Sequence, residues 1–132
     1  MQLNFFGGTG SVTGANFLMN FEEDGKKISI AVDCGLVQGN EESEKINKDP
    51  FPFEPSSVDF LFITHAHIDH IGRIPKLVKD GFNGRIISTL PTNQTIAYVV
   101  DQYWHNNTNL VYGANGIAAL TFYAVPISQE KE

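Results

Sequence analysis

An apolar stretch that runs directly into a cluster of histidines is the feature that most constrains this chain. Residues 58–64, VDFLFIT, have the composition of a strand that is buried on both faces of a sheet. The next segment, HAHIDH at residues 65–70, holds three of the chain's four histidines. A buried strand gives side chains at its end a rigid anchor. We therefore expect an α/β fold that presents these histidines where the strand ends.

The spacing of residues within HAHIDH is typical of a metal site. His65 and His67 are two positions apart, so in an extended segment both side chains project to one side and can hold one metal ion. Asp69 and His70 follow around a bend and can face a second ion nearby. Two ions in this arrangement can share a water molecule, lower its pKa and neutralise charge on a scissile group. The alternative, a histidine-rich surface loop or histidines satisfied by hydrogen bonds in the core, accounts poorly for so dense a cluster.

The pattern around the motif predicts a layered α/β fold, with helices packed on a sheet. Asp24-Gly25, between two apolar runs, predicts a hairpin turn. Four phenylalanines are assigned to the core: Phe5, Phe6, Phe60 and Phe62. Besides 58–64, strands are predicted over 2–6, 15–21, 27–33 and 84–89, and helices over 71–81 and 91–104. Residues 36–57 are expected to form a surface connection with a helical turn at 41–46, and residues 117–127 a strand or an extended tail.

Composition narrows the classes of function. The chain has 132 residues and a net charge of −6, so bulk charge does not draw it to nucleic acid, and any such contact must be local. The single cysteine, Cys34, excludes an internal disulfide and is compatible with a reducing compartment. We interpret it as a small buried side chain rather than a nucleophile. We find no signal-peptide pattern and no apolar run long enough to span a membrane, and therefore expect a soluble, cytoplasmic protein without membrane contact.

Several segments together resemble one enzyme superfamily. HAHIDH matches the HxHxDH motif of the metallo-β-lactamase fold hydrolases. The segments GGTGSVTGANFLMNF, AVDCGLVQG and THAHIDHIGRIPKLVKDGFNGRIIST are similar to the β-CASP branch, which comprises RNA-processing nucleases related to the cleavage and polyadenylation endonuclease. The resemblance covers about residues 1–95 and implies an αββα sandwich, of which this chain would supply a mixed sheet with helices on one face.

The resemblance also implies roles for individual residues. His65 and His67 would bind a first zinc ion, and Asp69 and His70 a second. Asp69 would in addition contact the nucleophilic water and so count as catalytic. Asp33 corresponds to an aspartate that supports the metal-binding loop from outside the ligand shell. Without the resemblance, Asp33 is equally well explained as a residue that ends a strand.

The family completes its two-zinc site with a further histidine, a bridging aspartate and a last histidine, all downstream. After residue 70 this sequence has only His105, which we interpret as a helix-end histidine rather than a ligand. Asp80 and Asp101 are interpreted as carboxylates on helix surfaces. We therefore expect residues 1–132 to be the N-terminal, truncated part of a metallo-β-lactamase-like domain with an incomplete metal site. The missing ligands would come from a C-terminal half or from a homo-oligomer.

The leading hypothesis is a zinc-dependent hydrolase that cleaves RNA phosphodiester bonds, with little activity in this chain alone. Up to two zinc ions are expected, and RNA is the expected substrate. Two alternatives stay open. One is a catalytically inactive remnant or interaction module of the same fold, and the other is a hydrolase that is not a nuclease, such as a thioesterase.

Overall fold

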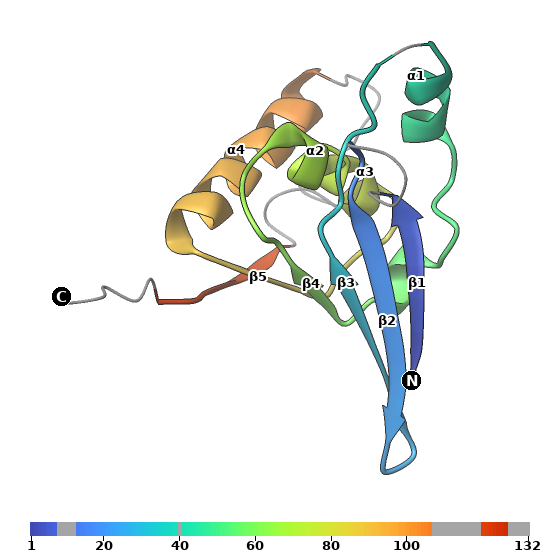
Figure 1. The fold of residues 1–132 in the computed structure, drawn as a ribbon. Coiled ribbons are helices and arrows are strands. Elements are labelled where there is room, and N and C mark those ends of the chain that lie inside the picture. The colour runs from blue at the N-terminus through green and yellow to red at the C-terminus, as the bar shows by residue number, and fades with distance from the viewer. Residues whose placement is uncertain (8–12, 40, 107–119, 127–132) are drawn as a thin grey trace, which may run out of the picture.

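A computed structural model describes residues 1–7, 13–39, 41–106 and 120–126 (Figure 1). Within these residues, six strands form one sheet whose spatial order follows the sequence. The strands are β1 (Gln2–Gly7), β2 (Asn16–Glu23), β3 (Lys26–Val32), β4 (Phe60–Phe62), β5 (Arg85–Ser88) and β6 (Thr121–Ala124). The helices are α1 (Glu41–Lys48), the short 3-10 helix η1 (Pro55–Ser57), α2 (Ile68–Ile71), α3 (Ile74–Lys79) and α4 (Leu90–Asn106).

The sheet is mixed. β1, β2 and β3 are antiparallel neighbours, whereas β3, β4, β5 and β6 are parallel. Asp24 and Gly25 join β2 to β3 with φ angles of 52° and 76°, the positive values that a tight hairpin turn requires, so the predicted turn is confirmed. Figure 1 shows this hairpin extending beyond the rest of the sheet.

Helices occupy the connections between the parallel strands, because parallel neighbours need a crossover. α1 and η1 lie between β3 and β4, α2 and α3 between β4 and β5, and α4 between β5 and β6. Figure 1 shows α2, α3 and α4 gathered on one side of the sheet. The expected α/β arrangement, a mixed sheet with helices on one face, is therefore confirmed.

The helix-covered face of the sheet carries the core. Leu18, Ala31, Leu61 and Ile86 are successive register partners across four strands, and all four are buried. Side chains from the helices complete this core, among them Ile74, Leu77, Ile96 and Val100. This packing fixes the end of β4, from which the histidine motif starts.

The opposite face of the sheet is also apolar, but the described residues leave it uncovered. Phe5 is 57% exposed, Phe62 39% and Tyr123 49%. The assignment of Phe5 and Phe62 to the core was therefore wrong, whereas Phe6 packs against the core from the helix-covered side. Alternation along a strand sends Leu61 to the helices and Phe62 away from them, so an apolar run did not mean burial on both faces.

Instead of one helix over 71–81, the structure has two short helices, α2 within the histidine motif and α3 after a break at Gly72 and Arg73. The amide of Arg73 donates to the carbonyl of Cys34 at 3.0 Å instead of continuing the helix. The chain turns helical again as the amide of Leu77 bonds to the carbonyl of Arg73 at 2.9 Å. Gly81, with φ of 121°, follows the second helix as expected of a C-terminal glycine.

The remaining elements differ from expectation mainly at their ends. α1 extends the predicted turn by two residues, and α4 begins just before Pro91. β6 falls within the predicted 117–127 stretch, of which residues 117–119 and 127 lie outside the described residues. Across the described ranges, no helix is long and apolar enough to cross a membrane.

Candidate metal centre

The histidine motif links the end of β4 to α2. His67 is extended, with φ of −77° and ψ of 147°, and its carbonyl accepts the amides of His70 at 2.8 Å and Ile71 at 3.1 Å. Asp69 and His70 therefore lie in the first turn after an extended segment that carries His65. This bend is the one that the sequence predicted.

Three of the predicted ligands converge. The potential ligand atoms of His65, Asp69 and His70 all lie within 4.8 Å of one another. The His65 and His70 rings have centroids 3.9 Å apart, and Nε2 of His70 lies 3.4 Å from Oδ2 of Asp69. His67 stands outside this group, edge-on to His65 with 4.7 Å between ring centroids. The geometry thus groups His65 with Asp69 and His70 rather than with His67 alone.

Asp33 orients the imidazole rings from behind. This residue is 2% exposed, and its Oδ1 accepts the Thr64 amide at 2.8 Å. Its Oδ2 accepts the Thr64 hydroxyl at 2.8 Å and contacts Nδ1 of His70 at 2.7 Å. Because a carboxylate only accepts hydrogen bonds, Nδ1 of His70 carries a proton, and in the neutral ring Nε2 then keeps its lone pair. Asp33 thus contacts Thr64 and His70 from outside the donor group, and its role as a support of the metal-binding loop stays a prediction.

Thr64 links Asp33 to the imidazole ring of His65. Its hydroxyl donates to Asp33, so its oxygen is left to accept from Nδ1 of His65 at 3.0 Å. In the neutral ring, Nε2 of His65 then also keeps its lone pair. A buried carboxylate thereby prepares two imidazole nitrogens for coordination, an arrangement that commonly supports metal-binding histidines.

The donor set fits a divalent metal ion. Two imidazole nitrogens and one carboxylate oxygen suit zinc and its neighbours, and three protein ligands leave a coordination position open. The side chains of His70 and Asp69 are 21% and 24% exposed, so the site is open to solvent on one side.

Backbone hydrogen bonds hold the motif against the loop that follows β3. The amide of Cys34 donates to His70 O at 2.8 Å, and that of Leu36 to Ile68 O at 3.1 Å. Between them, a Cβ on Gly35 would lie 1.6 Å from the carbonyl oxygen of Asp69. Only glycine allows the two backbones to approach this closely.

Sequence reasoning missed Arg73, which supports this loop. It is 7% exposed, and its Nε donates to the carbonyl of Gly35. Its guanidinium also lies 5.3 Å from the centre of the Phe51 ring. The available signal was its position four residues before the buried Leu77, which places a charged residue on the apolar side of the turn.

The other candidate ligands lie elsewhere. His105 is in the last turn of α4, its Nδ1 4.0 Å from Oδ1 of Asp101, and it lies outside the donor group found among the described residues. Asp80 forms an ion pair with Lys76. Asp80 and Asp101 are 31% and 32% exposed, so their interpretation as carboxylates on helix surfaces is confirmed.

Cys34 is fully buried beside the site, as predicted. Burial raises the pKa of its thiol from 9.0 to about 12, although the nearby charge of Arg73 opposes the rise. A thiol that stays protonated is a poor nucleophile.

We expect Cys34 to resist iodoacetamide at pH 8 in the folded protein and to react readily in urea. The raised pKa of Cys34 should contribute to the free energy of unfolding in full below pH 9. This contribution should decrease between pH 9 and about 12, because in that range only the thiol of the unfolded protein ionises. Urea titrations of the parent and Cys34→Ala across this range measure the difference. Rapid alkylation under native conditions would contradict the burial.

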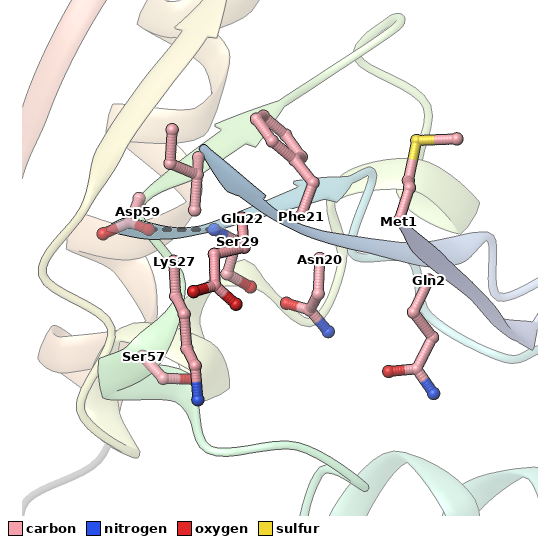
Figure 2. Close-up of a pocket in the computed structure, with 10 residues that line it drawn as sticks. Met1, Gln2, Asn20, Phe21, Glu22, Lys27, Ser29, Ser57 and Asp59 are labelled. Atoms are coloured by element: carbon pink, nitrogen blue, oxygen red, sulfur yellow. Dashed lines mark hydrogen bonds between the residues drawn. The ribbon is translucent and has the colours of Figure 1, made fainter. Parts of the chain in front are cut away.

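A separate hollow lies at the opposite end of the strands (Figure 2). It is lined by polar side chains such as Gln2, Asn20 and Ser57, and the amide of Ser29 donates to Asp59 at its wall at 2.9 Å. Its lining contains no histidine or cysteine. The donor group of His65, Asp69 and His70 therefore lies at the other end of the sheet from this hollow.

Comparison with known proteins identifies the fold family. A family model described as the metallo-beta-lactamase superfamily matches residues 25–112, which include the motif and Asp33. The chain belongs to the metallo-beta-lactamase superfamily. The HxHxDH resemblance noted in the sequence is thereby confirmed at the level of the superfamily.

Curated relatives of this metallo-beta-lactamase chain are named for RNA and transcription. It is 40% identical over 92 residues to ribonuclease TTHA0252 of Thermus thermophilus, which covers 70% of this chain and 20% of that protein. Identity is 26% over 140 residues to transcription termination factor FttA of Methanosarcina mazei, covering 99% of this chain and 21% of the relative. It is 34% over 101 residues to cleavage and polyadenylation specificity factor 73 of Drosophila melanogaster, covering 73% and 14%. The chain thus spans about a fifth or less of the length of these relatives.

Proposed function

We propose that this chain carries the first part of the active site of a zinc-dependent hydrolase of the β-CASP type, which cleaves RNA phosphodiester bonds. One observation carries the proposal: the donor atoms of His65, Asp69 and His70 converge within 4.8 Å of one another, with the buried Asp33 in contact with Nδ1 of His70. The 40% identity to a protein named as a ribonuclease supports RNA as the substrate. The one buried cysteine fits a reducing compartment, and we propose the cytoplasm as the site of action.

In this proposal His65, Asp69 and His70 hold zinc. His67, which lies beside His65, is a further ligand when the site fills with up to two ions. Bound zinc supplies a Lewis acid and an activated water. Asp69 has a second task, which is to accept a hydrogen bond from the attacking water and set its direction. Asp33 and Thr64 keep the imidazole rings in the tautomer that can bind metal.

We further propose that residues 1–132 form the N-terminal part of the catalytic domain. The donor group holds three convergent ligands, whereas a two-metal site needs more. The uncovered apolar face of the sheet, which includes Phe5, Phe62 and Tyr123, supports a second layer contributed by further polypeptide. The remaining ligands would lie on that layer, in a C-terminal half or a second copy.

A chimera tests the function. The chain replaces the matching N-terminal segment of the Thermus ribonuclease, to which it is 40% identical over 92 residues. We expect the chimera to cleave a labelled RNA in a chelator-sensitive manner, and a His70→Ala chimera to be inactive although it folds. Asp101→Asn, on the surface of α4, is the matched control and should cleave like the parent chimera.

The isolated chain completes the experiment. We expect no chelator-sensitive cleavage of RNA from it, with or without added zinc. Robust cleavage by the isolated chain would overturn the proposal of a partial site. A folded chimera that binds zinc but leaves RNA intact would remove RNA as the substrate.

A further inference from the structure

Asn16 begins β2 and is buried beside the metal centre. Its side chain is 1% exposed, and its Nδ2 donates to the main-chain carbonyl of Asp33 at 2.8 Å. We propose that Asn16 is a positioning residue of the metal site, which holds Asp33 in the backbone conformation from which its carboxylate reaches His70. The inference rests on the proposed function, because it assigns Asn16 a task in metal binding.

The conformation of Asp33 needs such support. Its φ is 60°, in the left-handed region that only a few per cent of residues other than glycine adopt, although aspartate adopts it more readily than most. Strained residues persist only where their surroundings hold them, and they concentrate at functional sites. The Asn16 amide meets the Asp33 carbonyl, whose direction would change if the backbone relaxed. The bond therefore stabilises the one conformation that points the carboxylate at Nδ1 of His70.

The residue next to Asn16 ties together the loops that carry these groups. The amide of Ala15 donates to Asp69 O at 3.1 Å, and its carbonyl accepts from Gly35 at 2.9 Å. Residues 15 and 16 thus contact both the loop after β3 and the metal-binding motif. Of these three hydrogen bonds, only the one from the Asn16 side chain can be removed by a substitution without changing the main chain.

The amide of Asn16 is poorly explained by stability alone. Its Oδ1 is buried and has no hydrogen-bond partner among the described residues. Burying an unsatisfied acceptor lowers stability, and the other buried position of β2, Leu18, is apolar. The donor atom Nδ2 is therefore the part of this side chain that the fold uses, and it acts on Asp33.

The test compares Asn16→Leu with Asn20→Leu, a second asparagine of β2 four residues farther along the strand, which lines the hollow of Figure 2. Asn16→Asp, which replaces the donor by an acceptor of the same size, serves as the second variant if the leucine variant does not fold. Circular dichroism establishes folding. Zinc affinity is measured by competition with a chromophoric chelator, and the His70 tautomer by ¹⁵N NMR of the metal-free protein.

We expect both Asn16 variants to bind zinc about 10- to 100-fold more weakly than the parent, as is usual when support behind a ligand is removed. His70 should lose its preference for a proton on Nδ1, and a purely structural role would not move this signal. Asn20→Leu should change neither property. Parent-like zinc affinity and His70 tautomer in the folded Asn16 variants would overturn the inference. If the parent itself does not bind zinc, the proposed function fails, while the tautomer in metal-free protein still decides the role of Asn16.

Discussion

Gly35→Ala is expected to destabilise the protein by about 3 kcal/mol or more and to disrupt the metal centre. The new Cβ would lie 1.6 Å from the Asp69 oxygen, 2.3 Å from the Asp69 carbon and 3.0 Å from the Ala15 amide nitrogen. All three are main-chain atoms, so no side chain can rotate out of the way. The two loops must separate, and Asp69 moves away from the histidines.

Urea unfolding and zinc titration measure both effects. Gly25→Asn, in the β2–β3 turn, is the matched control: no atom lies within 4 Å of the added Cβ, and asparagine tolerates the left-handed backbone there. We expect this control to stay within about 0.5 kcal/mol of the parent, as is usual for changes at open surface positions. A Gly35→Ala protein with parent-like stability and zinc affinity would show that the loops are not packed as described.

Asp33→Asn is expected to weaken zinc binding by about 10- to 100-fold while largely preserving the fold. Asparagine keeps the shape of the side chain and accepts the φ of 60°. The substitution replaces an oxygen, which now accepts hydrogen bonds from the Thr64 hydroxyl and from Nδ1 of His70, by an amide nitrogen that can only donate. His70 is then driven to carry its proton on Nε2, the atom that should bind metal.

Asp33→Ala should add a loss of stability of about 3 kcal/mol, because it leaves the Thr64 amide and hydroxyl without their buried partner. Zinc competition and the ¹⁵N shifts of His70 separate the two variants. Asp80→Asn, which changes a surface carboxylate paired with Lys76, is the control and should alter neither quantity. Full zinc affinity in Asp33→Asn would mean that the carboxylate does not set the tautomer of His70.

Local patterns were sufficient to predict most of the fold. The turn at Asp24-Gly25 requires positive φ angles, which these residue types tolerate, so the hairpin could be placed from its sequence. Gly81 ended its helix for the same reason. The break at Gly72 and Arg73 could not be predicted in this way, because it depends on a hydrogen bond from Arg73 to the distant Cys34.

In the candidate site, too, the residues that are close in sequence could be predicted and the long-range contacts could not. His65, Asp69 and His70 are close in sequence, so the motif placed them near one another, but its spacing predicted His65 with His67 rather than the group found. Asn16 and Arg73 act through carbonyl groups of residues 33 and 35. Helical spacing from Leu77 could have placed Arg73 on the apolar side of its turn, but no sequence pattern records which carbonyl either side chain contacts. The exposure of Phe62 was missed because the hydrophobicity of a strand does not show which face of the sheet the helices cover.

Because β4 is apolar on both faces, hydrophobicity alone would tolerate a slip of one residue that exchanges Leu61 with Phe62. The structure blocks this slip through Asp33, whose amide bonds to Phe62 O at 2.8 Å and whose carboxylate bonds to the Thr64 amide. Asp33, which contacts His70, thus also fixes the register of β4 on β3. A shift in the register of β4 on β3 would therefore also displace Asp33 from the histidines. Correct pairing of these two strands places the ligands as well.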